Sequence, residues 1–179
     1  MSAPCPECGK IAKITSYDNN GNVSSGVDFD NKETRYTYDA LGREIQRIEN
    51  YGTPDAKTTT REWDPQQWLV TRIAAPNKLE AFSYDAKGNL LSHTVTPTSD
   101  ASGSQGFGAT ASGSINRTDW TYDDSSHVLT ATERTDGAVT GTWALTYNSQ
   151  GNLQTLTNPD GKTGRITLYD EADRVLEAV

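Results

Sequence analysis

An aromatic residue followed by Asp or Asn recurs seven times along the chain, and this internal repeat restricts the fold more than any other feature of the sequence. Successive anchor aromatics are 21 to 25 residues apart in five of the six intervals and 38 residues apart in the fourth. A period of this length is typical of one supersecondary unit that stacks against copies of itself. The anchors are Tyr17, Tyr38, Trp63, Tyr84, Tyr122, Tyr147 and Tyr169.

The residues that flank each anchor predict a strand, a tight turn and a second strand. Asp at the first position of a type I turn accepts a hydrogen bond from the backbone two residues on, and Gly at the fourth position tolerates a positive φ. We expect a different turn type in the copies that have Gln67, Ser126 or Asp173 instead of Gly. An apolar residue follows two positions later in six copies, as expected for a half-exposed strand. The turn glycines are Gly21, Gly42, Gly88 and Gly151.

A second kind of turn connects one unit to the next. The Asp136-Gly137 and Asp160-Gly161 pairs are strong signals for two-residue hairpin turns, and Asp30-Asn31 has the corresponding place in the first unit. No segment shows helical periodicity. Hydrophobic residues make up only 34% of the chain, which favours a thin wall over a dense core. We therefore predict an all-β fold, an antiparallel β-hairpin repeat meander that forms a curved single-layer sheet.

The repeats divide the chain into three parts. Residues 1–10 form an N-terminal tail with a Cys-x-x-Cys motif, and residues 11–179 hold the seven repeats. The long fourth interval contains an insert at 97–114 that is rich in Gly, Ser, Thr and Ala. Because this composition offers almost no anchor except Phe107, we expect the insert to be a flexible loop.

Charge and hydropathy exclude two classes of partner. The chain has 24 acidic and 16 basic residues, a net charge of −8, whereas a nucleic-acid binder is expected to carry a basic face. No run of apolar residues is long enough for a membrane span, and no signal peptide is visible.

Few residues suggest metal chemistry. Cys5 and Cys8, followed by Gly9, have the spacing of half a zinc knuckle, but a structural zinc site needs four ligands and no second pair follows. A local disulfide or two free thiols are the alternatives. The segment Asp18–Asn22 is oxygen-rich like a calcium loop but lacks the later Glu, and turn chemistry explains it equally well.

The sequence contains no recognisable catalytic constellation. His93 and His127 have no nucleophile motif nearby, so we expect strand or turn histidines on the polar face. The repeated Asp residues could supply the acid/base carboxylate pair of a glycosidase, but each is needed for turn geometry. The repeated aromatic rings suit either a sugar-binding strip or a cross-strand packing ladder, and we favour the ladder. We expect no cofactor and no enzymatic activity.

The repeat resembles the tyrosine–aspartate (YD) repeat of Rhs proteins. The resemblance lies in units such as Tyr84–Leu91 and Tyr38–Arg43 and in the Asn158–Thr163 turn, and it covers roughly residues 11–179. In full-length Rhs and related toxin-complex proteins, strips of such hairpins spiral into a hollow shell that encloses a toxic C-terminal domain. Similar repeats occur in large extracellular adhesion proteins.

The resemblance implies a structural role. It indicates an interior fragment or short relative of a larger bacterial Rhs-type toxin or surface protein, secreted or at the cell surface. The expected partners are other repeats of the parent chain and an enclosed toxin domain. Open sheet edges and an uncovered inner face also predict either self-association or a tight curl that lets the sheet cover itself. The alternative is an extracellular module that binds glycans or a cell surface.

Overall fold

The computed structural model describes residues 14–179 and shows an all-β fold. Apart from one short 3-10 helix, η1 (Gly106–Gly108), the regular elements are antiparallel strands that follow one another in sequence order. This confirms the predicted fold class of an antiparallel single-layer meander with two strands per repeat. The strands are β1 (Ile14–Tyr17), β2 (Val23–Val27), β3 (Glu33–Tyr38), β4 (Glu44–Glu49), β5 (Lys57–Trp63), β6 (Val70–Ala75), β7 (Lys78–Tyr84), β8 (Leu90–Pro97), β9 (Asn116–Tyr122), β10 (Val128–Thr135), β11 (Ala138–Tyr147), β12 (Leu153–Thr157), β13 (Thr163–Tyr169) and β14 (Val175–Ala178).

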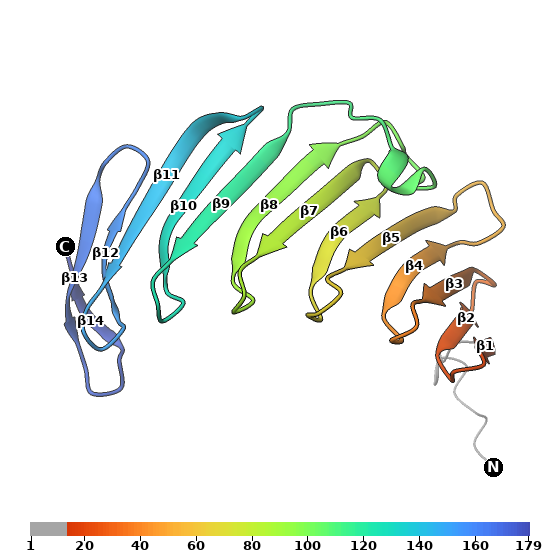
Figure 1. The fold of residues 1–179 in the computed structure, drawn as a ribbon, viewed down its shortest axis with the longest axis horizontal. Coiled ribbons are helices and arrows are strands. Elements are labelled where there is room, and N and C mark those ends of the chain that lie inside the picture. Colours follow the sequence, from red (N-terminus) through yellow and green to blue (C-terminus); the bar gives the residue numbers. More distant parts are fainter. Residues whose placement is uncertain (1–13) are drawn as a thin grey trace, which may run out of the picture. The chain divides into compact units, whose positions relative to one another are not determined.

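The chain divides into two compact units, which are described separately (Figure 1). The first contains β1 to β6, the start of β7 and the segment Pro97–Ser112. The second contains the rest of β7, then β8 and β9 to β14. Within each unit every strand pairs with its sequence neighbour, and Figure 1 shows the anchor turns along one end of the strands and the connecting turns along the other.

The two faces of the sheet differ in chemistry, as the alternation of side chains along a strand requires. In the second unit one face carries threonines in cross-strand register, and their hydroxyl oxygens lie 2.6 Å apart in Thr121–Thr130 and 2.7 Å apart in Thr146–Thr155. The opposite face carries the rings and aliphatic side chains, such as the Leu145–Leu156 pair. Threonine pairs of this kind stabilise neighbouring strands by about 0.2–1 kcal/mol each.

A single layer leaves almost no residue fully enclosed. Among residues 15–179, Ala74 is the one buried hydrophobic residue, at 2% exposure. It lies on β6, where the register pairs it with Thr60 of β5, and Gly103 of the segment Pro97–Ser112 lies close to the backbone of Thr58 and Pro76. The six anchors from Tyr38 to Tyr169 are only half-buried and Tyr17 is exposed, so the sheet is held together mainly by backbone pairing and polar contacts.

The segment 97–112 has more anchors than its composition indicates. The Asp100 carboxylate, 4% exposed, accepts hydrogen bonds from the backbone of Ser102, Gly103 and Gln105 at 2.8 to 3.2 Å. The loop carbonyl of Ser102 accepts from Thr58 N–H at 2.7 Å, beyond the last pair of β5 with β6, Thr60–Ala74. Our expectation that only Phe107 would hold this segment is therefore wrong, because Asp100 organises the loop from within.

The connecting turns are of more than one type. Asp136 and Gly137 both have positive φ, 50° and 83°, which is the predicted two-residue hairpin geometry. Asp160-Gly161 differs from the prediction, because it belongs to a five-residue turn in which Asn158 Oδ1 accepts from Lys162 N–H at 2.9 Å. The Asn158 side chain therefore closes a five-residue turn of the kind that also follows the anchor aromatics, in place of a two-residue hairpin turn.

Candidate functional site

The most regular constellation in the structure is the set of turns that follow the anchors, which we call the turn row. We number positions from the anchor aromatic, so the Asp or Asn after it is position +1. In the second repeat, Asp39 Oδ1 accepts from the backbone N–H of Leu41 and of Arg43, both at 2.9 Å. The N–H of Gly42 also donates to Asp39 O at 3.0 Å. One carboxylate thus closes the whole turn.

Six of the seven copies adopt this same turn. Position +4 has positive φ in all six, including 70° at Ser126 and 58° at Asp173, and the turn glycines have φ of 77° to 87°. The expectation of a different turn in the Ser126 and Asp173 copies is wrong, because the hydrogen bonds to the +1 carboxylate hold the left-handed conformation without glycine. The Gln67 copy does differ: Asp64 N–H donates to Leu69 O, five residues on.

The residue at position +5 links neighbouring turns, and sequence reasoning missed this role. Asn89 Nδ2 donates to Asp85 Oδ2 of its own turn at 2.8 Å and to Ser126 Oγ of the next turn at 3.0 Å. Asn152 Nδ2 reaches Asp173 Oδ1 of the next turn at 2.7 Å. The signal was present in the sequence, since position +5 is Asn, Arg or His in six copies: Asn22, Arg43, Asn89, His127, Asn152 and Arg174.

Arg43 shows the fullest form of this link. Its Nε donates to Asp39 Oδ2 at 2.7 Å, and its Nη1 donates to the backbone carbonyl of Asp64 in the next turn at 2.8 Å. The guanidinium also lies 5.6 Å from the ring centre of Trp63 and 5.8 Å from that of Trp68. Its side chain is only 10% exposed, which strengthens these contacts relative to a surface ion pair.

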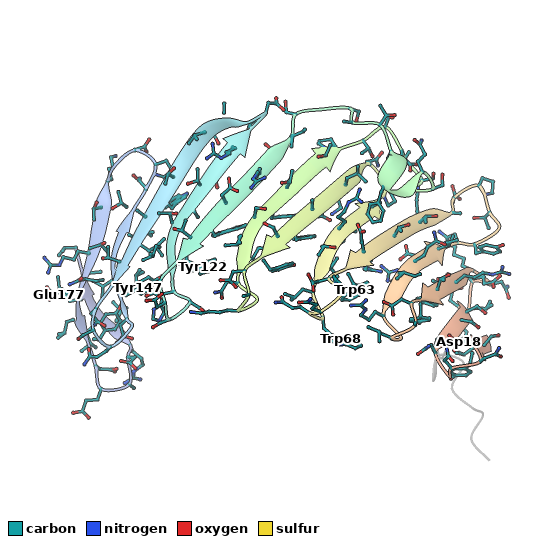
Figure 2. All side chains as sticks on the ribbon, viewed as in Figure 1. Asp18, Trp63, Trp68, Tyr122, Tyr147 and Glu177 are labelled. Atoms are coloured by element: carbon teal, nitrogen blue, oxygen red, sulfur yellow. The ribbon has the colours of Figure 1, made fainter. Side chains whose placement is uncertain are left out.

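The anchor aromatics form a second link between repeats. The Tyr122 hydroxyl donates to Leu90 O, and the Tyr147 hydroxyl to Val128 O, both at 2.8 Å. Tyr169 contacts Leu153 O in the same way, and Trp63 Nε1 donates to Glu44 O at 2.9 Å. In each case the acceptor is position +6 of the preceding repeat. Figure 2 shows Trp63, Tyr122 and Tyr147 near the turn ends of their strands.

These contacts shift the ionisation of the groups that make them. The side chain and backbone of Asn22 donate to Asp18 and hold the pKa of its carboxyl below the usual value. The His127 side chain and backbone have the same effect on the pKa of Asp123. Burial raises the pKa of the Tyr122 and Tyr147 hydroxyls. At neutral pH the Asp18 and Asp123 carboxylates are therefore charged acceptors, and the Tyr122 and Tyr147 hydroxyls are neutral donors.

The Trp63 copy departs from the others in a way that exposes a large aromatic surface. Here position +5 is Trp68, whose side chain is 68% exposed (Figure 2). Its turn is one residue longer, since Trp63 pairs with Val70 across the hairpin whereas Tyr122 pairs with Val128. This is the one anchor turn among residues 14–179 that has an indole at the linking position.

His127 belongs to a pocket of about 380 Å³ within the second unit. Its Nδ1 lies 2.9 Å from Asp123 Oδ2, and its ring stacks on Tyr147 with centroids 4.7 Å apart. The imidazole edge with Nε2 faces Gly151, where a Cβ atom would lie 3.2 Å away. Within residues 14–179 no serine hydroxyl hydrogen-bonds to this imidazole. The imidazole thus joins the Asp123 turn to the anchor ring of the next repeat.

His93 does not lie on the polar face as we expected. It stacks on Phe82, with ring centroids 4.6 Å apart and planes within 4°, and its Nε2 lies 3.1 Å from Glu80 Oε1. The register pairs it with Thr118, two residues from Trp120, so it belongs to the aromatic face. Stacking between flat rings explains why an imidazole is accommodated there.

The structure does not test the candidate zinc ligands. Cys5 and Cys8 lie outside the described residues. Within residues 14–179 no group of three or more His, Cys, Asp or Glu side chains is placed to hold a metal ion. In the suggested calcium loop, Asp18 Oδ1 accepts from the backbone N–H of Asn20 and Asn22, and Asp18 Oδ2 accepts from Asn22 Nδ2. No helix in this part of the chain is long and apolar enough to cross a membrane.

Solved structures with the same fold are found among TcdB2-TccC3 proteins. Crystal structures of TcdB2-TccC3, of TcdB2-TccC3 without its hypervariable C-terminal region and of TcdB2-TccC3-TEV match with TM-scores of 0.54, 0.54 and 0.53. Sequence identity is 15%, 15% and 16%, and each match covers 92% of this chain. No family model matches the chain, and no curated protein matches it.

The matched region is a small part of each of those proteins. This chain spans about a tenth of the length of the TcdB2-TccC3 chains that it matches, since 10% of each is covered. At such low identity the likeness concerns the fold alone. The hairpin meander of this chain is therefore an architecture that a segment of TcdB2-TccC3 also adopts.

Proposed function

We propose that this chain is a structural repeat segment of a larger Rhs-type toxin or surface protein, and that it forms part of a β-shell around a C-terminal toxin. The observation that carries the proposal is how the polar side chains of the turn row are used. The +1 side chains close their own turns, while Asn89 and the Tyr122 and Tyr147 hydroxyls join neighbouring hairpins. The fold shared with part of TcdB2-TccC3, a Tc toxin, supports the same role.

The proposal carries three consequences. The chain acts without catalysis and without a cofactor, and its domain organisation is a repeat array that begins near residue 11. The anchors and turn glycines serve as structural positions of that array. The parent protein is secreted or displayed at the cell surface of a bacterium, where its partners are further repeats and the enclosed toxin domain.

The test is to determine the structure of the natural full-length protein by electron cryo-microscopy. The expected result is a continuous wall in which the hairpins of residues 14–179 are flanked by further hairpins, with separate density inside. Limited proteolysis of the same sample should leave the enclosed domain uncut until the wall is opened by denaturant. Hairpins that project as an exposed arm, with no enclosed density, would refute the proposal.

Trp68 favours a second candidate function, binding of a glycan. An indole that is 68% exposed offers a face for sugar stacking. A sugar panel titrated against the chain and followed by tryptophan fluorescence tests this directly. Saturable binding that Trp68→Ala abolishes, with unchanged stability, would favour the glycan-binding role. A flat titration for the whole panel would exclude it for those sugars.

A further inference from the structure

The second unit holds two indoles that are separated by a single small side chain. Ala131 of β10 pairs with Trp120 of β9 on one side and with Trp143 of β11 on the other. Cross-strand partners lie on the same face of a sheet, so the two indoles, which we call the indole pair, flank one methyl group. Each of β9, β10 and β11 pairs with a strand on both sides, so the arrangement lies away from the edges of the sheet (Figure 1).

The spacing of the indole pair suits one small group between the rings. Neighbouring strands lie about 4.8 Å apart, so the backbones of β9 and β11 are about 10 Å apart. A group seated over Ala131 is then about 5 Å from each indole, within the range of about 6 Å over which an aromatic face attracts a cation. Trp143 is 36% exposed and Trp120 is half-buried. Within residues 14–179 neither indole stacks on another ring or donates a hydrogen bond.

A carboxylate without a counter-ion lies beside the indole pair. Glu133 follows Ala131 by two residues on β10 and therefore lies on the same face. It pairs with Gly141, and its Oε2 is 3.6 Å from the position that a Cβ atom on Gly141 would take, two residues before Trp143. Among the residues that the structure describes, the Glu133 carboxylate has no ion-pair or hydrogen-bond partner. It therefore adds an uncompensated negative charge next to the rings.

The arginines that neighbour this row in sequence belong to the opposite face. Arg117 and Arg134 alternate with Thr118 and Glu133 along β9 and β10, and they donate to Asp119 on the other side of the sheet at 2.7 and 3.0 Å. Thr118 pairs with Glu133 across the strands, and its hydroxyl has no hydrogen-bond partner within residues 14–179. The indole pair is therefore bordered by one carboxylate and one hydroxyl.

We propose that the indole pair and Glu133 bind a small, free quaternary ammonium cation of the choline type. Aromatic rings attract cations through their quadrupole, most strongly in tryptophan, and the carboxylate supplies complementary charge. A quaternary ammonium suits this site better than a primary one. A primary ammonium has three N–H donors, and it would find only Glu133 and Thr118 as acceptors in exchange for water. A fully methylated nitrogen has no donor to leave unpaired.

The proposal goes beyond the toxin-shell proposal and does not rest on it. A wall segment needs no ligand, so a chain that binds no cation would overturn this inference and leave the full-length wall to be tested on its own. The site is also separate from Trp68, which belongs to the first unit.

The experiment is a titration of the full chain with choline chloride, followed by the NMR signals of the four tryptophan indole N–H groups. Sodium chloride at the same ionic strength is the blank, and single Trp→Phe variants assign the signals. The signals of Trp120 and Trp143 should shift in a saturable way, while those of Trp63 and Trp68 stay in place. The neutral analogue of choline, with a tert-butyl group instead of the trimethylammonium, should bind at least about fivefold more weakly.

Variants separate the charge from the rings. Glu133→Gln changes an exposed side chain without changing its shape, so the chain should fold, bind choline several-fold more weakly and bind the neutral analogue as before. Trp143→Ala should weaken choline binding at least about fivefold, and Trp68→Ala, which removes an exposed indole elsewhere, is the matched control. Circular dichroism checks the fold of each variant.

Four results would overturn the proposal. They are indole signals that do not respond to choline, a neutral analogue that binds as tightly as choline, a Glu133→Gln chain with wild-type affinity, and phosphocholine or neutral sugars that bind more tightly than choline. The last result would assign the indole pair to a phosphorylated ligand or to a glycan instead of a free cation.

Discussion

The guanidinium Nη1 of Arg43 donates a 2.8 Å hydrogen bond to the backbone carbonyl of Asp64, one repeat further along the chain. The same side chain is bound to Asp39 in its own turn. One residue therefore fastens two turns, and its position recurs at a fixed distance from every anchor. In the first unit this contact, together with the Trp63 bond to Glu44 O, supplies the order that a buried core supplies in a globular domain.

Removing the Arg43 side chain should destabilise the chain. We expect Arg43→Ala to lower the free energy of unfolding by about 1.5–3 kcal/mol, because two hydrogen bonds of a nearly buried charged group are lost. Arg174→Ala is the matched control, since it removes an arginine at the same repeat position that is 79% exposed, and its effect should stay within about 0.5 kcal/mol. Urea unfolding at a concentration where the chain is monomeric measures both. Equal losses in the two variants would contradict the linking role.

The anchor hydroxyl should contribute separately from its ring. Tyr147→Phe keeps the ring stacked on His127 and removes only the 2.8 Å bond to Val128 O, so we expect a loss of about 1 kcal/mol. Tyr36→Phe is the control, because Tyr36 precedes the anchor Tyr38 and its hydroxyl has no hydrogen-bond partner among residues 14–179. A Tyr147→Phe variant as stable as the Tyr36→Phe variant would show that the hydroxyl contact does not contribute to the free energy of unfolding.

The loop 97–112 should depend on one carboxylate. Asp100→Ala leaves three backbone N–H groups and the Ser102 hydroxyl without their acceptor, and we expect a loss of about 2 kcal/mol or more. Asp55→Ala, at an exposed turn, should change the stability by less than about 0.5 kcal/mol. Amide exchange should also become faster at Thr58, whose N–H donates to the loop. Unchanged exchange at Thr58 would mean that the loop keeps its place without Asp100.

Acid should weaken the turns. Burial opposes ionisation of Asp85, but the Asn89 side chain and the backbone of Asn89 and Lys87 outweigh it, so its pKa lies below the usual value. A carboxyl with a lowered pKa in the folded state stabilises the chain above its unfolded pKa, and this contribution is lost as the pH falls through the folded value.

The matched variant is Asp85→Asn, since Asn148 forms the same turn with an uncharged oxygen. The stability difference between wild type and Asp85→Asn should be largest near neutral pH and shrink as the pH falls below about 4, where the unfolded carboxyl takes up its proton. Urea unfolding at a series of pH values measures the difference. A difference that stays constant down to pH values well below this range would show that the charge of Asp85 plays no part.

The sequence was sufficient for the period, the strand order and the positions of the turn glycines, because these depend on residues within one repeat. It was insufficient for the Ser126 and Asp173 turns, where hydrogen bonds to a carboxylate replace the conformational freedom of glycine. The +5 links were missed because Asn, Arg and His share no hydropathy or size. Their common role becomes visible only when two turns are placed side by side.

The loop illustrates a different limit. Its composition is that of an unstructured segment, and composition was the ground for expecting mobility. Its anchoring depends on Thr58, about 40 residues earlier, and on Asn77, whose N–H donates to Asp100 O at 2.8 Å. Contacts at that distance along the chain cannot be read from local patterns.

Each link joins a repeat only to its neighbour, so repeats can be added to or lost from the gene without changing the contacts of the others. A duplication or loss of one repeat of DNA leaves every remaining hairpin with the same two kinds of neighbour, so the protein can change length without redesign of its other parts. Out-of-register recombination between copies would therefore yield folded products. Lineages of such chains should differ in copy number more readily than in the residues at +1 and +5.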